Sequence, residues 1–294
     1  MVLSTEAVPR PAHRYRLPAL LQDIRLLDLL ELSGTTQEAA RLACLSQPTV
    51  SRRTRLLTDD FALEVNRRRR EGCCYGTSPV MQLLRLGCRA HRLASGVARL
   101  GTDVLLQPLL ADCPWLLPSP ARFRSIACWL ELVRQGVIDG ALVSGLEVRG
   151  EVPPQAEDVE LLSLGELSVG LAMAPGQALP AGPLPTVLVP NRAVAQGLHR
   201  ALQQRGLPLK TAGNTCHSAR HWRQRLESSG WAMPLPQLEP DHWWEGLRQL
   251  PLPTPLHIPL WLVVPADWRQ QAVLLHTGEQ LCANPALRIT SIDA

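Results

Sequence analysis

The chain has 294 residues, 46% of them hydrophobic, which allows about two domains with sizeable cores. No stretch approaches the ~20 uninterrupted apolar residues of a membrane span, so we expect no membrane partner. The net charge of +4 is uneven, because residues 1–99 hold 16 Arg against 9 acidic residues (net +7) and residues 100–294 have a net charge of −3. A basic front half joined to a slightly acidic back half favours a DNA-binding module fused to a part that does not bind DNA.

Residues 1–19 are polar, Pro-rich and basic, and we treat them as an N-terminal extension without a signal peptide. The eight Cys residues are scattered without a CxxC pair. Both features favour a cytoplasmic protein with free, mostly buried thiols. The adjacent Cys73 and Cys74 are either a redox sensor or an incidental loop pair.

The first predicted helix covers Leu20–Leu32, where Leu20, Ile24, Leu27 and Leu30 recur at helical spacing. Two short helices follow within 35–57. Thr35 and Glu38 have the spacing of a capping box, so the first of the two should begin at Thr36.

The second short helix should be capped by Ser46, with Pro48 tolerated in its first turn. Val50, Thr54 and Leu57 fall on one face, which predicts that this face packs inside. The opposite face carries the chemistry of a major-groove reader: Gln47 can pair with adenine, the Thr49 methyl can contact thymine, and Arg52 can reach guanine or phosphate. The alternative is a small helical hairpin with a solvated basic face.

The run LSQPTVSRRTRLL at 45–57 resembles the DNA-binding segment of LysR-type transcriptional regulators. The resemblance begins at Ala39-Ala40 and continues without gaps through 61–63 to Arg68. Thr36 and Asn66 depart from it, because family members usually carry Phe at both places. The resemblance implies a winged helix-turn-helix domain over 20–77 that binds double-stranded promoter DNA.

The segment 64–77 holds four consecutive arginines, 67–70, followed by Gly72 and Gly76, and we interpret it as the basic tip of the wing. The alternative is a solvated, disordered run. The DNA-binding residues predicted in all are Thr35, Ser46, Gln47, Pro48, Thr49, Ser51, Arg52, Arg53, Arg55, Arg67, Arg68 and Arg69.

Ser78-Pro79 should open a long linker helix over 78–98. Apolar residues recur in it with gaps of three and four, which is typical of a narrow helix–helix seam. Arginines at 85, 89, 92 and 99 occupy its other faces. We expect the seam to join two copies of the chain, as the linker helix does in LysR-type regulators, although part of it could pack on its own domain. The residues of the predicted seam are Leu83, Leu86, Ala90, Leu93 and Val97.

From residue 99 onward, short apolar runs alternate with helical stretches, which predicts an α/β fold with βαβ units and parallel sheets. The segments 99–110 and 136–145 resemble the first elements of the LysR effector domain. This resemblance implies two Rossmann-like lobes, about 99–166 with 265–294 and about 167–264, and a ligand cleft at their junction. The sequence from residue 99 onward has no glycine-rich phosphate loop, Walker sequence or Ser-centred elbow, so we expect neither an enzyme nor a cofactor.

Ligands of such lobes bind at the carboxyl ends of strands, often at a helix N-terminus, so a small, anionic effector is expected there. Thr102 corresponds to the hydroxyl residue that follows the first strand in the family. Each of the effector-binding residues predicted here could instead be an ordinary cap or turn residue. The predicted effector-binding residues are Thr102, Ser119, Ser144, Asn191 and Thr215.

Two alternatives to an effector-controlled regulator stay open. One is a constitutive DNA-binding protein whose effector domain takes no ligand. The other is a metal-responsive regulator, because Cys216, His217 and His221 form a Cys-His-x-x-x-His run. No further ligand follows at a recognisable spacing, His199 and His242 being guesses, so we assign no metal site.

Overall fold

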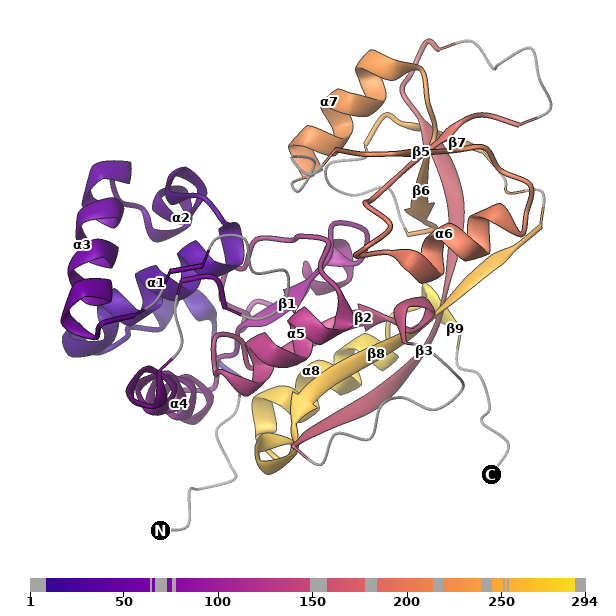
Figure 1. Cartoon of the computed structure of the whole chain (residues 1–294). Coiled ribbons are helices and arrows are strands. Elements are labelled where there is room, and N and C mark those ends of the chain that lie inside the picture. Colours follow the sequence, from indigo (N-terminus) through magenta and orange to yellow (C-terminus); the bar gives the residue numbers. More distant parts are fainter. Residues whose placement is uncertain are drawn as a thin grey trace.

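The computed structural model describes residues 9–63, 65–66, 73–75, 78–148, 158–177, 184–213, 219–238, 245–250, 252 and 254–288 (Figure 1). A helical unit at the N-terminal end is followed by an α/β unit built around one curved sheet. This arrangement agrees with the expected α/β multidomain class. The α-helices are α1 Gln22–Ser33, α2 Thr36–Ala43, α3 Gln47–Asp60, α4 Pro79–Ala94, α5 Ile126–Arg134, α6 Gln196–Gln203, α7 Ala219–Ser229 and α8 Ala272–Cys282.

The strands are β1 Leu100–Thr102, β2 Gly140–Ser144, β3 Val159–Met173, β4 Val187–Val189, β5 Leu209–Thr211, β6 Met233–Pro236, β7 Arg248–Leu250, β8 Leu256–Pro265 and β9 Leu287–Arg288. Short 3-10 helices are η1 Ala12–Arg14, η2 Ala19–Leu21, η3 Gln107–Leu110, η4 Gly145–Glu147 and η5 Ala266–Trp268.

The helix caps of the N-terminal unit are those predicted. The Thr35 hydroxyl accepts a hydrogen bond from the Glu38 amide at 3.2 Å, and α2 begins at Thr36. The Ser46 hydroxyl accepts from the Thr49 amide at 3.3 Å at the start of α3. The expected core position Leu20 is wrong, because this side chain is exposed and lies in η2, before α1 begins.

Small residues let α1, α2 and α3 approach closely. Ala39 and Ala40 of α2 are buried against α1 leucines and Val50 of α3. The turn into α3 passes through Cys44, which takes a left-handed conformation at φ 55°. A tight two-helix unit therefore projects α3 outward (Figure 1).

The linker helix α4 is shorter than predicted. It begins at Pro79, where Ser78 accepts from the Met81 amide at 3.1 Å, and it ends at Ala94 instead of 98. Gly96 turns the chain at φ 73°, and β1 starts at Leu100. The faces that carry Arg85, Arg89 and Arg92 are buried in the same chain, against α1 and the α/β unit.

The main sheet has the order β1-β2-β8-β3-β6, with β7 and β9 also paired to β3. Among the described strands, β1–β2 and β4–β5 pair in parallel, and the other strand pairs are antiparallel. The expectation of parallel sheets is therefore only partly right. The reason is that β3 and β8 run along each other in opposite directions through both lobes, from Val159 opposite Pro265 to Val169 opposite Leu256.

The two lobes share these long strands (Figure 1). The register of β3 against β8 shifts between Ser163 and Gly165. The first lobe adds β1, β2, α5 and α8, and the second adds β4, β5, β6, α6 and α7. The predicted lobe limits at 166/167 and 264/265 fall inside continuous strands.

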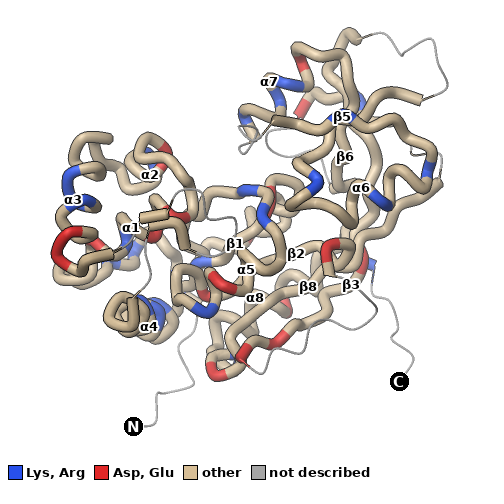
Figure 2. Tube along the Cα trace, viewed as in Figure 1, with Lys and Arg blue, Asp and Glu red and all other residues tan. Residues whose placement is uncertain are grey.

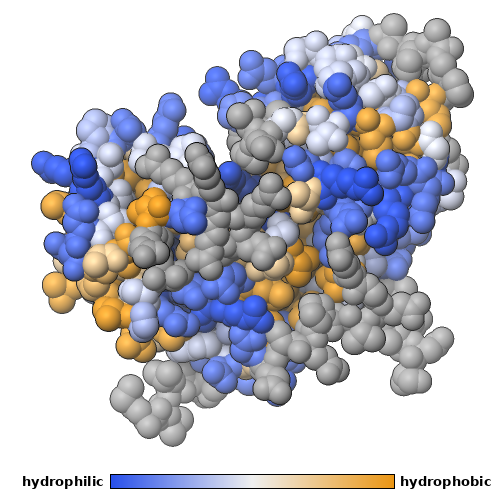
Figure 3. Space-filling view, in the orientation of Figure 1, coloured by the Kyte–Doolittle hydropathy of each residue, from blue (hydrophilic) through white to orange (hydrophobic). Residues whose placement is uncertain are grey.

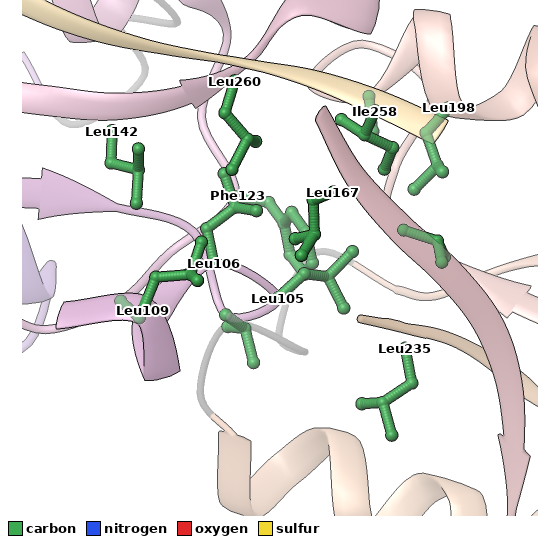
Figure 4. Packing of buried hydrophobic residues seen from close by; sticks show 14 of the residues in the cluster. Leu105, Leu106, Leu109, Phe123, Leu142, Leu167, Leu198, Leu235, Ile258 and Leu260 are labelled. Atoms are coloured by element: carbon green, nitrogen blue, oxygen red, sulfur yellow. The ribbon is translucent and has the colours of Figure 1, made fainter. Parts of the chain in front are cut away.

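One large apolar cluster runs across the junction of the lobes. Figure 4 shows Leu105, Leu106 and Phe123 of the first lobe gathered near Leu167 and Ile258 of the shared strands. The junction is thus largely apolar, which decides what kind of ligand it can hold.

Candidate nucleic-acid interface and inter-lobe hollow

The outward face of α3 is polar and basic. Val50, Thr54 and Leu57 are buried as predicted, and the Thr54 hydroxyl donates to the Val50 carbonyl at 2.8 Å. Figure 2 shows positive charge along the outer edge of α3, away from the α/β unit. A helix exposed in this way can enter a major groove. Its exposed residues are Gln47, Pro48, Ser51, Arg52 and Arg55, with Thr49 half-buried.

Side chains at the start of α3 are held in place by neighbours. The Gln47 side-chain amide donates to the Thr36 hydroxyl at 3.0 Å, and the Ser46 and Thr49 hydroxyls lie 2.7 Å apart. Gln47 is thereby fixed at the N-terminal end of α3, where base edges would be reached.

Of the predicted DNA contacts, Thr35 and Arg53 have partners inside the chain, and three more lie outside the described residues. The Thr35 hydroxyl caps α2, and the Arg53 guanidinium pairs with Asp23 of α1, Nε to Oδ1 at 2.5 Å. Arg67, Arg68 and Arg69 lie outside the described residues. The Asn66 amide donates to the Cys74 carbonyl at 2.8 Å, which brings the two ends of the predicted wing together.

The predicted seam on α4 is only half accessible. Leu83 is 69% exposed and Val80 is exposed beside it, while Leu86 and Ala90 are half-buried. Figure 3 shows hydrophobic surface gathered around α4 at the lower left. Leu93 and Val97 are each 1% exposed inside their own chain, so their assignment to a seam between copies is wrong. The reason is that the chain turns into β1 after Ala94 and buries both side chains in the first lobe.

The opposite face of α4 carries a buried ionic cluster. Arg85 Nε donates to Asp28 of α1 at 2.8 Å. Arg92 makes two hydrogen bonds, 2.6 and 2.9 Å, to the carboxylate of Asp139, just before β2. Arg89 donates to the carbonyls of Val133 and, at 2.7 Å, Ile138. The cluster ties the helical unit to the first lobe within one chain.

Four guanidinium groups meet two carboxylates in this cluster, counting Arg99, whose Nη1 lies 3.8 Å from Asp28. Burial lowers the pKa of Arg89 and of Arg99 to about 10. Burial alone would raise the pKa of Asp139, but the adjacent Arg92 and Arg89 hold it below its ordinary value. The Asp139 carboxylate is therefore charged at neutral pH, and its attraction for Arg92 and Arg89 is fully available.

A narrow hollow lies between the lobes. Apolar side chains dominate its wall, and the polar groups that reach it are Asp103, Arg124, Ser144 and Glu147. Phe123 stacks edge-on against Trp222 of the second lobe, with ring centroids 5.3 Å apart. This is the cleft expected from the sequence, but its lining is more apolar and more acidic than expected.

Both acidic side chains of the hollow cap backbone amides. Asp103 Oδ1 accepts from the Leu105 and Leu106 amides at 2.8 and 3.0 Å. Glu147 reaches from the first lobe to the start of α6 in the second, where its two oxygens accept from the Gly197 and Leu198 amides at 3.0 and 2.9 Å. Burial raises the pKa of Asp103 to about 6 and also raises that of Glu147.

Of the predicted effector residues, Ser144 alone among the described ones lines the hollow, and its hydroxyl accepts from the Leu146 amide. Thr102 is wrong, because its buried hydroxyl donates to the Leu142 carbonyl inside the sheet, and Asp103 makes the cap assigned to it. Ser119 and Asn191 do not line the hollow, and their assignment to an effector stays a prediction. Asn191 caps the Ala193 amide, a turn role that its residue type favours. Thr215 lies outside the described residues.

The metal alternative is largely untested by the structure. Cys216, His217 and His242 lie outside the described residues, and His199 is buried with its Nε2 donating to the Pro190 carbonyl at 2.7 Å. Within the described ranges, no three His, Cys, Asp or Glu side chains gather as a metal site would require. Within the same ranges, no helix has both the length and the apolar character needed to cross a membrane.

No family model and no curated protein matches the chain. Solved structures similar to it include a full-length OxyR variant from Pseudomonas aeruginosa, with 15% identity, a TM-score of 0.46, and coverage of 91% of this chain and 99% of that chain. CbnR, a LysR family transcriptional regulator, has 13% identity and a TM-score of 0.47, with coverage of 89% and 97%. Full-length LysG from Corynebacterium glutamicum with bound effector Arg has 14% identity and a TM-score of 0.42, with coverage of 89% and 97%. Because all three TM-scores are below 0.5, we infer the function from the geometry described above.

Proposed function

We propose that the chain is a sequence-specific DNA-binding transcriptional regulator of LysR type. The observation that carries this proposal is the α2–α3 unit, in which two capped helices present a solvent-exposed face with Gln47, Ser51, Arg52 and Arg55. Arginine and glutamine side chains on the first turns of such a helix can read guanine and adenine edges. The basic segment at 67–70 would add contacts to the backbone or the minor groove.

The proposal includes self-association through α4. Val80 and Leu83 are exposed and apolar on a helix whose other side is fully occupied. These two side chains lie three residues apart on the helix, and the hydrophobic surface gathered around α4 (Figure 3) favours an interaction surface there. A dimer would place two copies of α3 on two half-sites of one promoter.

DNA recognition is tested by selecting bound duplexes from a random pool and then measuring affinity for the selected and a scrambled duplex. We expect Arg52→Ala to reduce affinity for the selected duplex about tenfold or more, with a smaller loss on the scrambled one, because a base contact discriminates by about 1–3 kcal/mol. Arg269→Ala is the control, since that arginine pairs with Glu160 on the α/β unit. Failure of any sequence to be enriched would contradict the proposal.

A second candidate is a DNA-binding protein without effector control. It is favoured by the two carboxylates, Asp103 and Glu147, that occupy backbone amides where an anionic effector would bind. Ligand binding in the hollow separates the two candidates, because a ligand that binds the folded protein raises its melting temperature by mass action.

A further inference from the structure

We propose that the hollow between the lobes binds an apolar molecule that carries a positive charge, instead of the anionic effector that the sequence suggests. This inference rests on the proposed function. It starts from Asp103 and Glu147, which fill the places where an anion would be held. Backbone amides at the turn after β1 and at the start of α6 are the natural anion sites of the two lobes. Asp103 occupies the first and Glu147 the second.

The packing around Glu147 leaves little room to displace it. Gly197 lies so close to the Leu146 carbonyl that a Cβ atom could not be placed there. An incoming anion would have to break both hydrogen bonds of Glu147 and separate η4 from α6. Its own negative charge would also be repelled by two carboxylates in a site of low polarity.

The wall supplies apolar and aromatic surface. Leu105, Leu106, Phe123, Trp129 and Ile258 line the hollow, and Phe123 is held by its edge-on contact with Trp222. Aromatic faces attract cations as well as apolar groups. A compact aryl or alkyl body with an amine would therefore match the wall and the carboxylates together.

The charge balance of the lining favours a cation. Among the described lining residues, Arg124 is the only cation beside the two carboxylates. Its guanidinium donates to the Glu31 and Leu32 carbonyls at 2.8 and 2.9 Å and lies 5.6 Å from the Trp129 ring centroid. The arginine is thus held toward the helical unit. A bound amine would offset the cost of keeping both carboxylates out of water.

The test compares three probes of one size: 2-phenylethylamine, 2-phenylethanol and phenylacetate. Their binding to the full-length protein is measured at pH 8 by calorimetry and by thermal shift. We expect the amine to bind at least tenfold more tightly than phenylacetate, with the alcohol between them. Equal or tighter binding of phenylacetate, or no binding of any probe, would overturn the proposal.

Asp103→Asn identifies the group responsible. Because Asp103 accepts both amides through Oδ1, asparagine can keep both hydrogen bonds while removing the charge. We expect amine affinity to fall about tenfold and alcohol affinity to stay within twofold of the wild type. Asp112→Asn, at an exposed carboxylate, is the matched control. An unchanged amine affinity in Asp103→Asn would overturn the assignment. Binding of the selected DNA, measured separately, shows whether the proposed function itself has failed.

A second inference comes from the alternation of side chains at 122–124. Phe123 points into the junction of the lobes (Figure 4). Its neighbours contact the helical unit instead: Arg122 lies against Gly34 at the end of α1, and Arg124 donates to the carbonyls of Glu31 and Leu32. An extended segment places successive side chains on opposite sides, so one segment contacts both the hollow and α1.

Glu31 extends this contact toward the predicted wing. Its buried carboxylate accepts from the Cys74 and Tyr75 amides, both at 2.9 Å. We infer that the segment 122–124 couples the hollow to the base of the wing within one chain. A ligand that moves Phe123 would shift Arg124, and with it the end of α1 that positions Glu31.

Hydrogen exchange tests this coupling directly. We expect Arg124→Met to raise the exchange rates of the Cys74 and Tyr75 amides at least fivefold while leaving those of α8 unchanged. Arg134→Met, on the surface of the same lobe, is the control. Unchanged protection at 74–75 in Arg124→Met would overturn the inference. A uniform rise over the whole chain would also overturn it, because it would mean global destabilisation.

Discussion

The buried carboxylate of Asp139 offers a direct test of what joins the helical unit to the first lobe. It accepts two hydrogen bonds from Arg92 and one from the Arg99 amide at 2.7 Å, and Arg89 Nε lies 3.5 Å away. In Asp139→Asn one acceptor oxygen remains, but the charge is lost and Arg92 is left without its ionic partner. Breaking a buried ion pair on one side costs about 3–5 kcal/mol. We expect the free energy of unfolding to fall by that amount.

The measurement is urea unfolding of the full chain at pH 7, followed by circular dichroism. Asp158→Asn is the control, because its pair with Arg134 is exposed to solvent and such pairs contribute about 0–1 kcal/mol. If the two variants lose the same free energy within about 1 kcal/mol, the reasoning about buried charge is refuted.

The difference in unfolding free energy between wild type and Asp139→Asn should also depend on pH, and it should shrink as the pH falls. The folded pKa of Asp139 lies below its ordinary value, so its contribution is present above about pH 4, the unfolded pKa. That contribution is lost as pH falls through the folded pKa. Wild type and Asp139→Asn should therefore converge in stability under acid and differ most near neutrality.

Other predictions test α4, Asp103 and Gly34. Leu83→Asp should dissociate the oligomer without loss of folding, because Leu83 is exposed, whereas Leu93→Asp should unfold the chain, because Leu93 is buried. An unchanged oligomer of Leu83→Asp in sedimentation would remove α4 from the interface. Asp103 has a folded pKa of about 6 against about 4 when unfolded, so stability should fall as pH rises through this window. Asp103→Asn should then raise the free energy of unfolding at pH 8 by up to about 3 kcal/mol, and identical pH profiles for the two proteins in urea titrations would contradict this. Gly34→Ala should lower the free energy of unfolding by about 1–3 kcal/mol, since Gly34 has φ 70° and its missing Cβ makes room for Arg122. A melting temperature equal to that of wild type would contradict this packing.

Local signals in the sequence predicted local structure well. The caps at Thr35 and Ser46 were predictable because each is made within three residues of the chain. The inward face of α3 was predictable for the same reason, since helical spacing alone places Val50, Thr54 and Leu57 together.

The environment of α4 was not predictable in this way. Its seam of leucines implied that the arginines would lie on the outside, yet the structure buries Arg85, Arg89 and Arg92. Their partners, Asp28 and Asp139, are 57 and 47 residues away in the chain and carry no local signal. One signal was available, because arginines at 85, 89, 92 and 99 recur at intervals of 4, 3 and 7, which is itself a helical stripe.

The site in the hollow was predicted in position but not in chemistry. Strand ends correctly indicated where the junction lies, and Ser144 is there. Thr102 was one residue off, because η3 replaces the expected helix after β1 and the adjacent Asp103 makes the turn. Glu147 was missed, although it lies two residues after the predicted strand at 136–145.

The shift of register in β3 between Ser163 and Gly165 has a mechanical consequence. Because β3 and β8 are continuous through both lobes, the lobes cannot rotate about a free loop, and any closure must bend a hydrogen-bonded ribbon. Ribbons bend most easily where pairing is already irregular, and Gly165, at φ 110°, relieves the strain of such a bend. The lobes should therefore bend elastically about this point and return to one resting angle after small displacements.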